Sequence, residues 1–118
     1  MKLKTVKRMK TSDHTFKGAG KKFLLEITAP GFSMHEDNFT VTLRQGKTVK
    51  TFQKTDLVED TVIIEGSERH DFYLCLDSSP FVPGLITCIV RAYVPDTDFP
   101  SGIRIEIDKF DLTCIEPV

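Results

Sequence analysis

Short apolar runs alternate with turn-forming residues along the chain. The runs are rich in Val, Ile, Thr, Phe and Tyr, which favour β-strands, and the seven glycines and six prolines fall between them. Turn residues at this spacing are typical of a β-sandwich or barrel. The only helical signal is the capping-box spacing of Ser33 and Glu36, which predicts one turn at most. The pattern predicts strands near residues 3–9, 14–17, 22–28, 39–45, 48–54, 61–65, 71–77, 85–94 and 103–115.

Alternation within the runs indicates which strands are half exposed. Phe39, Val41 and Leu43 alternate with polar residues, so one face of their strand is expected to be buried and the other solvated. Residues 85–94 are apolar on both faces. This pattern predicts a strand in the middle of a sheet or buried at an interface.

The last strand changes its apolar phase. Its isoleucines occupy alternate positions from Ile103 to Ile107, and the apolar set then continues at Phe110, a shift of one residue. A β-bulge absorbs such a shift. We therefore predict a bulge at Asp108–Lys109.

The hairpin around Arg44–Lys47 has an ambiguous register. A three-residue loop pairs Leu43 with Val49 and leaves Phe52 on the solvated face, whereas burying Phe52 needs another loop length or a bulge. A buried phenylalanine is the usual outcome. We nevertheless interpret Phe52 as a contact residue for a partner.

The composition is that of an ordinary soluble globule, with 40% apolar and 28% charged residues. A chain of 118 residues has room for one domain. No apolar run approaches the ~20 residues of a membrane span. Charged residues interrupt every apolar stretch at the amino terminus, so no secretory signal is expected.

The near-neutral net charge of −1 conceals a division along the chain. Residues 1–22 carry a charge of +7 and residues 23–118 a charge of −8. We predict a basic arm, residues 1–13, joined through a flexible glycine-rich joint at Gly18–Gly20 to a single sandwich domain, residues 14–118. The candidate partner-binding residues of the arm are Lys2, Lys4, Lys7, Arg8 and Lys10.

The arm is better suited to protein than to nucleic acid. Lysine and arginine bind phosphates, but residues 1–13 hold no aromatic side chain for base stacking, and the acidic body repels a polyanion. Apolar residues break the charge run, so the arm is expected to add a strand to a neighbouring sheet while its lysines meet acidic groups.

No catalytic or metal-binding motif stands out. The three cysteines, Cys75, Cys88 and Cys114, fall in predicted strands and are interpreted as reduced, buried thiols. The three histidines are scattered and interpreted as solvated, and no spacing typical of a metal motif occurs. We expect no catalytic residue, metal or cofactor. The histidines are His14, His35 and His70.

The loop Pro95–Gly102 contains two nearby carboxylates, Asp96 and Asp98. Calcium binds several oxygens at once, and D-x-D begins many calcium loops. This loop lacks a later acidic ligand, and Asp and Pro form turns through their own backbone chemistry. A turn without metal is therefore the favoured interpretation.

The stretch PGLITCIVRAYVPDTDFPSGIRIE, residues 83–106, resembles small virion proteins of tailed, crAss-like bacteriophages of gut Bacteroidetes. Upstream, Pro30–Met34 and Phe39–Arg44 resemble the early strands of the same group, and the resemblance covers roughly residues 22–112. The matching features are Pro83–Gly84, Ala92–Asp96, Asp98–Pro100, Gly102 and Arg104.

This resemblance implies an immunoglobulin-like antiparallel β-sandwich with a structural role in the virion, assembled in the host cytoplasm. The expected function is that of an auxiliary capsid protein that decorates or stabilises the shell. Its expected partners are the major capsid protein and, as a second partner, copies of itself. The alternatives are a tail or baseplate attachment module and a carbohydrate-binding adhesion domain. The carbohydrate alternative is weakened by the absence of Trp and the presence of just two Tyr.

Overall fold

The computed structural model describes residues 4–7 and 14–118, with side chains described from residue 14 onward. Strands make up 67% of the described residues, and the one helical element among them is a 3₁₀ turn, η1 (Lys54–Asp56). The predicted strands are confirmed, with shifts at their ends. They are β1 (Lys4–Lys7), β2 (His14–Phe16), β3 (Gly20–Thr28), β4 (Asn38–Gln45), β5 (Thr48–Gln53), β6 (Val58–Ile64), β7 (Ser67–Asp77), β8 (Gly84–Pro95) and β9 (Ile103–Glu116).

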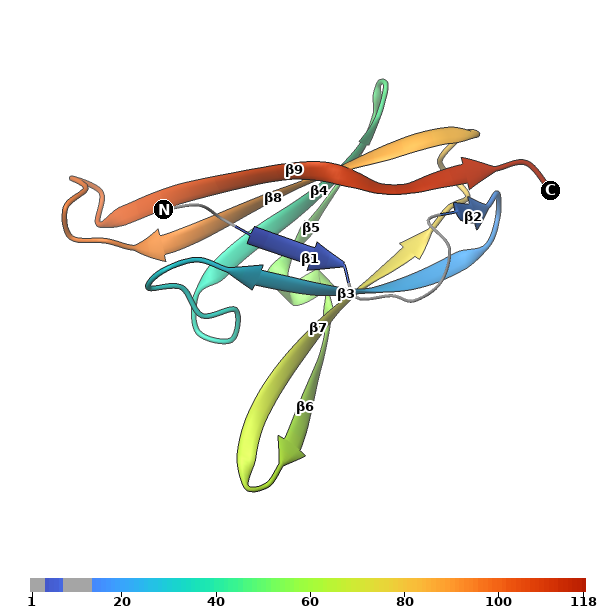
Figure 1. Cartoon of the computed structure of the whole chain (residues 1–118). Coiled ribbons are helices and arrows are strands. Elements are labelled where there is room, and N and C mark those ends of the chain that lie inside the picture. The colour runs from blue at the N-terminus through green and yellow to red at the C-terminus, as the bar shows by residue number, and fades with distance from the viewer. Residues whose placement is uncertain (1–3, 8–13) are drawn as a thin grey trace.

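The strands form two packed sheets (Figure 1). One sheet has the order β1-β3-β7-β6, and the other has the order β2-β9-β8-β4-β5. In immunoglobulin lettering these are A-B-E-D and a G-F-C sheet extended by β5. The pairs are antiparallel except β2 with β9, which run parallel. The predicted all-β, immunoglobulin-like sandwich is confirmed.

The core between the sheets is built from phenylalanine and aliphatic side chains. Phe39 of β4 is fully buried, and its ring meets those of Phe32 and Phe72 edge-on at centroid distances of 6.3 and 5.5 Å. Cys88 of β8 is also fully buried, with a free thiol. Hydrophobic burial and aromatic packing therefore hold the two sheets together.

The predicted bulge in β9 is wrong in position. Pairing with β8 is regular from Ile103 to Asp111, and the register shifts at Ile86/Thr87, which lie opposite Thr113 and Asp111. The isoleucines and Phe110 belong to opposite faces of one regular strand, so no phase change occurs at Asp108–Lys109. Ile105 and Ile107 consequently point away from the core and are 55% and 57% exposed.

The β4–β5 hairpin corrects the interpretation of Phe52. Gln45 pairs with Thr48, so the loop has two residues, and Gly46 at its first position has φ 57°, as in a type II′ turn. This register pairs Phe52 with Val41 and buries it in the core at 8% exposure. Phe52 is therefore a packing residue and not an exposed contact residue.

The amino-terminal residues depart from the expected arm and joint. Lys4–Lys7 pairs with Leu25–Thr28 of the same chain, so β1 is an edge strand of the domain. The predicted flexible joint is a tied turn, because Ala19 NH donates to Phe16 O (2.9 Å) and Ser78 NH donates to Ala19 O (3.2 Å). Of the five basic residues proposed for the arm, Lys4 and Lys7 lie in β1, whereas Lys2, Arg8 and Lys10 fall outside the described residues.

The β6–β7 hairpin projects beyond the body of the sandwich (Figure 1). Its turn consists of Glu65 and Gly66, whose φ values of 51° and 78° are those of a type I′ turn. The β3–β4 connection reaches the base of this hairpin, and one of its turns is closed by Asp37 NH donating to Ser33 O (2.8 Å). Ser33 Oγ also accepts from Glu36 NH (3.3 Å), which confirms the expected turn.

Candidate functional site

The most prominent candidate surface is the solvent side of β8 and β9. Ile105 pairs with Tyr93, and Ile107 pairs with Arg91. Paired residues of an antiparallel ladder share a face, so these four side chains form one surface, which extends to Ile89 opposite Lys109. We call this surface, made by Ile89, Arg91, Tyr93, Ile105, Ile107 and Lys109, the β8–β9 face.

The β8–β9 face combines apolar and basic side chains, with Arg91 between Ile89 and Tyr93 along β8 and Lys109 next to Ile107 along β9. The two exposed isoleucines lie next to the partly buried ring of Tyr93, and Arg91 and Lys109 bring positive charge. Tyrosine and arginine are enriched where proteins bind one another. The strand predicted to be central or at an interface is central, with β9 and β4 as its neighbours, and Ile89 on its outer face is 8% exposed.

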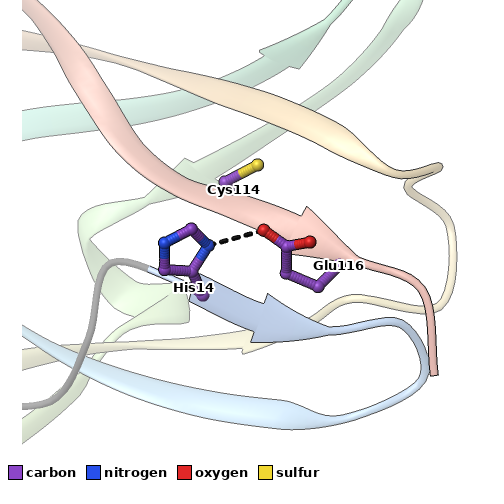
Figure 2. Close-up of side chains that lie close together, drawn as sticks. All are labelled: His14, Cys114 and Glu116. Carbon is purple, nitrogen blue, oxygen red and sulfur yellow. Dashed lines mark hydrogen bonds and ion pairs between the residues drawn. The ribbon is translucent and has the colours of Figure 1, made fainter.

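Three polar side chains gather at the far end of β9 (Figure 2). His14 Nδ1 lies 2.6 Å from a carboxylate oxygen of Glu116, and Cys114 belongs to the same group, with ligand atoms all within 4.8 Å of one another. The parallel pairing of β2 with β9 creates this contact, because His14 is the register partner of Cys114. His14 belongs to a different group from His35 and His70, and its side chain is 56% exposed, in agreement with the predicted scattering and solvation.

This cluster has the composition of a thiol nucleophile and its base, but its electrostatics oppose that role. Burial and the neighbouring Glu116 charge raise the pKa of the Cys114 thiol. The thiolate is the nucleophile and the metal ligand, so a raised pKa disfavours both kinds of chemistry. The ion pair of His14 with Glu116 instead fastens β2 to the end of β9.

The three thiols differ in exposure. Cys75 is exposed, Cys114 is intermediate and Cys88 is buried, so the expectation of three buried cysteines is wrong for Cys75. Cys75 and Leu76 are neighbours in β7, and strand alternation turns one side chain outward when the other is in the core. Burial raises the pKa of Cys88 to about 12.

We expect thiol labelling to follow this order. At pH 7.5 a maleimide should modify Cys75 first and Cys114 more slowly, and Cys88 should react only after unfolding, because both its access and its thiolate fraction are low. Raising the pH should accelerate the labelling of Cys114, because its raised pKa keeps the thiol protonated near neutrality. Mass spectrometry of peptides over time measures the three rates, and equal rates in the native protein would contradict this assignment.

The aspartate loop is held by Arg104 and contains an internally bonded turn. Asp96 accepts from Asp98 NH at 3.0 Å and forms an ion pair with Arg104. Arg104 also donates to Pro30 O at 3.0 Å and contacts Glu106 at 3.3 Å. Asp96 is therefore occupied by donors from the chain, in agreement with the favoured interpretation of this loop as a turn.

This arrangement predicts an acid-dependent contribution to stability. The hydrogen bond from Asp98 NH and the Arg104 guanidinium hold the pKa of Asp96 below its usual value of 3.8. A carboxylate whose pKa is lower in the folded than in the unfolded state stabilises the fold at pH values above the unfolded-state pKa. This stabilisation is lost as the pH falls through the folded-state pKa. Asp96→Asn should therefore lower the melting temperature at pH 7, and this difference should shrink as the pH falls below 3.8, as measured by calorimetry. A pH-independent difference would oppose the assignment.

A second cluster of polar side chains was not predicted from the sequence. His35, Glu59 and His70 come from the β3–β4 connection, β6 and β7, and their ligand atoms lie close together at the base of the projecting hairpin. The sequence signal was limited to the presence of two histidines, because no motif links the three positions. The predicted scattering of the histidines is wrong for His35 and His70, whose ring centroids are 3.6 Å apart.

Within the described residues, none of the helical segments has the length and apolar character required to cross a membrane. No family model, curated protein or solved structure matches the chain.

Proposed function

We propose that this protein is a non-catalytic binding component that attaches through the β8–β9 face to a partner protein. The observation that carries the proposal is the outward placement of Ile105 and Ile107, both more than half exposed, beside Tyr93 on the central strands of a sheet. Contiguous exposed apolar surface with a polar border is typical of interaction sites.

The partner we propose is a protein whose docking surface combines apolar and acidic side chains. Arg91 and Lys109 give the β8–β9 face its positive charge, and complementary charges direct association and register. A glycan is a weaker candidate, because sugar binding relies on exposed aromatic faces and Tyr93 is partly buried among its neighbours.

The biological setting we propose is the virion of a tailed bacteriophage, where the protein acts as an auxiliary capsid protein bound to the major capsid protein. The resemblance of residues 83–106 to small virion proteins supports this setting. That stretch contains most of the β8–β9 face. A β-sandwich with one interaction surface is suited to making many identical contacts on a capsid shell. A tail or baseplate position is the alternative.

Co-sedimentation tests this proposal. The purified protein is mixed with capsid shells, with tails and with DNA of the phage that carries its gene, and pelleted over a range of concentrations. Binding to shells that saturates at a fixed number of copies is expected. Saturable binding to tails alone would assign the protein to the tail instead of the capsid. Binding to DNA alone or to none of the three would overturn the proposal.

A further inference from the structure

The base of the projecting hairpin holds a compact group of two imidazoles and one carboxylate. One oxygen of Glu59 lies 2.9 Å from His35 Nδ1 and 3.0 Å from His70 Nδ1. The two imidazole rings are stacked, with centroids 3.6 Å apart and planes 8° from parallel. Both rings therefore present the same nitrogen to the same carboxylate.

We propose that His35, Glu59 and His70 form a binding site for a divalent first-row transition metal ion, with Zn²⁺ the preferred occupant. Imidazole nitrogen and carboxylate oxygen are ordinary zinc ligands, and two histidines with one glutamate are a known ligand set. Tetrahedral zinc with bonds of ~2.0–2.1 Å separates its ligand atoms by about 3.3 Å. The Glu59 oxygen already lies within about half an ångström of this separation from each Nδ1, and the two stacked rings have to turn out of their parallel arrangement so that both Nδ1 lone pairs point at one ion.

The surroundings hold two of the ligands in place. Lys54 Nζ donates to the backbone oxygens of His35 (2.7 Å) and Asp37 (2.8 Å), which fixes the turn that carries His35. On the far side of the second imidazole, Glu68 lies 3.5 Å from His70 Nε2. A carboxylate behind a metal-bound histidine fixes its tautomer and raises its basicity.

The site is accessible and leaves room for a fourth ligand. The side chains of His35, Glu59 and His70 are 51%, 35% and 18% exposed, so an ion can enter from solvent without unfolding. Three protein ligands leave one tetrahedral position for water or for a group from a partner. Zinc binds the two Nδ1 atoms through their lone pairs, so both nitrogens must be unprotonated in the metal-bound form.

Occupation of this site would join the β3–β4 connection to the β6–β7 hairpin. Most of β6 is exposed, and β6 pairs only with β7 among the described strands. A metal bridging His35 with Glu59 and His70 would fasten the hairpin to the β3–β4 connection. The expected consequence is a more rigid hairpin and a more stable domain, because the ion binds the folded state and not the unfolded chain.

Calorimetric titration of the full chain with ZnCl₂ at pH 7.5, in a buffer that does not chelate metal, tests the proposal. One equivalent should bind, and a hundredfold excess over the dissociation constant should raise the melting temperature by roughly 10 °C. His35→Gln, Glu59→Gln and His70→Gln should each weaken binding at least about 10-fold, and Glu68→Gln should weaken it by a similar or smaller factor.

The second cluster provides a matched control. The variant His14→Gln/Cys114→Ser removes two possible ligands at the end of β9 and should leave the zinc affinity unchanged. Binding that is lost in this control and retained in His35→Gln would overturn the assignment, as would the absence of any zinc binding by the wild-type protein.

A measurement on the unaltered protein covers the case in which a variant fails to fold. Zinc should shift the imidazole ¹⁵N resonances of His35 and His70 and leave those of His14 in place. Resonances of all three histidines that stay unchanged with excess zinc, or that change only for His14, would contradict the proposal. This result is independent of partner binding, since the site lies on the other sheet from the β8–β9 face.

Discussion

Phe39→Ala is expected to lower the free energy of unfolding by about 3–5 kcal/mol. The Phe39 ring is fully buried between the sheets and packs edge-on against Phe32 and Phe72, which come from a loop and from the opposite sheet. Alanine leaves a cavity that the two sheets cannot easily close, because β4 is paired on both sides. Urea unfolding followed by circular dichroism measures the loss.

Phe99→Ala is the matched control for this change. Phe99 lies in the loop before β9 and is 44% exposed. Its removal should alter the free energy of unfolding by less than about 1 kcal/mol, as is usual for surface positions. Equal losses in the two variants would mean that the sheets do not pack around Phe39 as described.

The double variant Ile105→Lys/Ile107→Lys is expected to weaken binding to the partner at least about 100-fold while the fold is retained. Residues at the centre of an interface can each contribute 2 kcal/mol or more, and two such losses exceed two orders of magnitude. Both side chains project into solvent in the free protein, so lysine is accommodated there. The added charges would have to be buried at the centre of the interface.

Ile63→Lys/Ile64→Lys is the control, because it makes the same chemical change at two strand isoleucines of similar exposure. Ile63 and Ile64 are 69% and 50% exposed and belong to the other sheet. This variant should bind with the affinity of the wild-type protein. Weakening by the control and not by the β9 variant would move the attachment surface to the β6–β7 hairpin.

The positions of the strands are predicted well from the sequence, because strands and turns are local features. The runs around Val41 and Ile86 have β-forming residues bounded by turn residues, and both appear as strands. The choice of face in β9 was harder. Ile105 and Phe110 are both apolar, and periodicity alone cannot say which set faces the core when both faces of a strand are hydrophobic.

Strand register and contacts between distant parts of the sequence are the features that sequence patterns predict poorly. Phe52 was misassigned because a difference of one residue in the hairpin loop moves every following side chain to the other face. The group formed by His35, Glu59 and His70 depends on a loop and a hairpin meeting in space, with His35 and Glu59 separated by 24 positions in the sequence. No local pattern contains that information, so the structure was needed to find it.

Covalent footprinting of the unaltered protein, free and bound to capsid shells, tests attachment through the β8–β9 face most directly. A carbene or hydroxyl-radical reagent labels exposed side chains, and mass spectrometry reads the label at each position. Binding should protect Ile105, Ile107 and Tyr93 and leave Ile63 labelled as in the free protein. Protection of Ile63 with unchanged labelling of Ile105 and Ile107 would contradict the account.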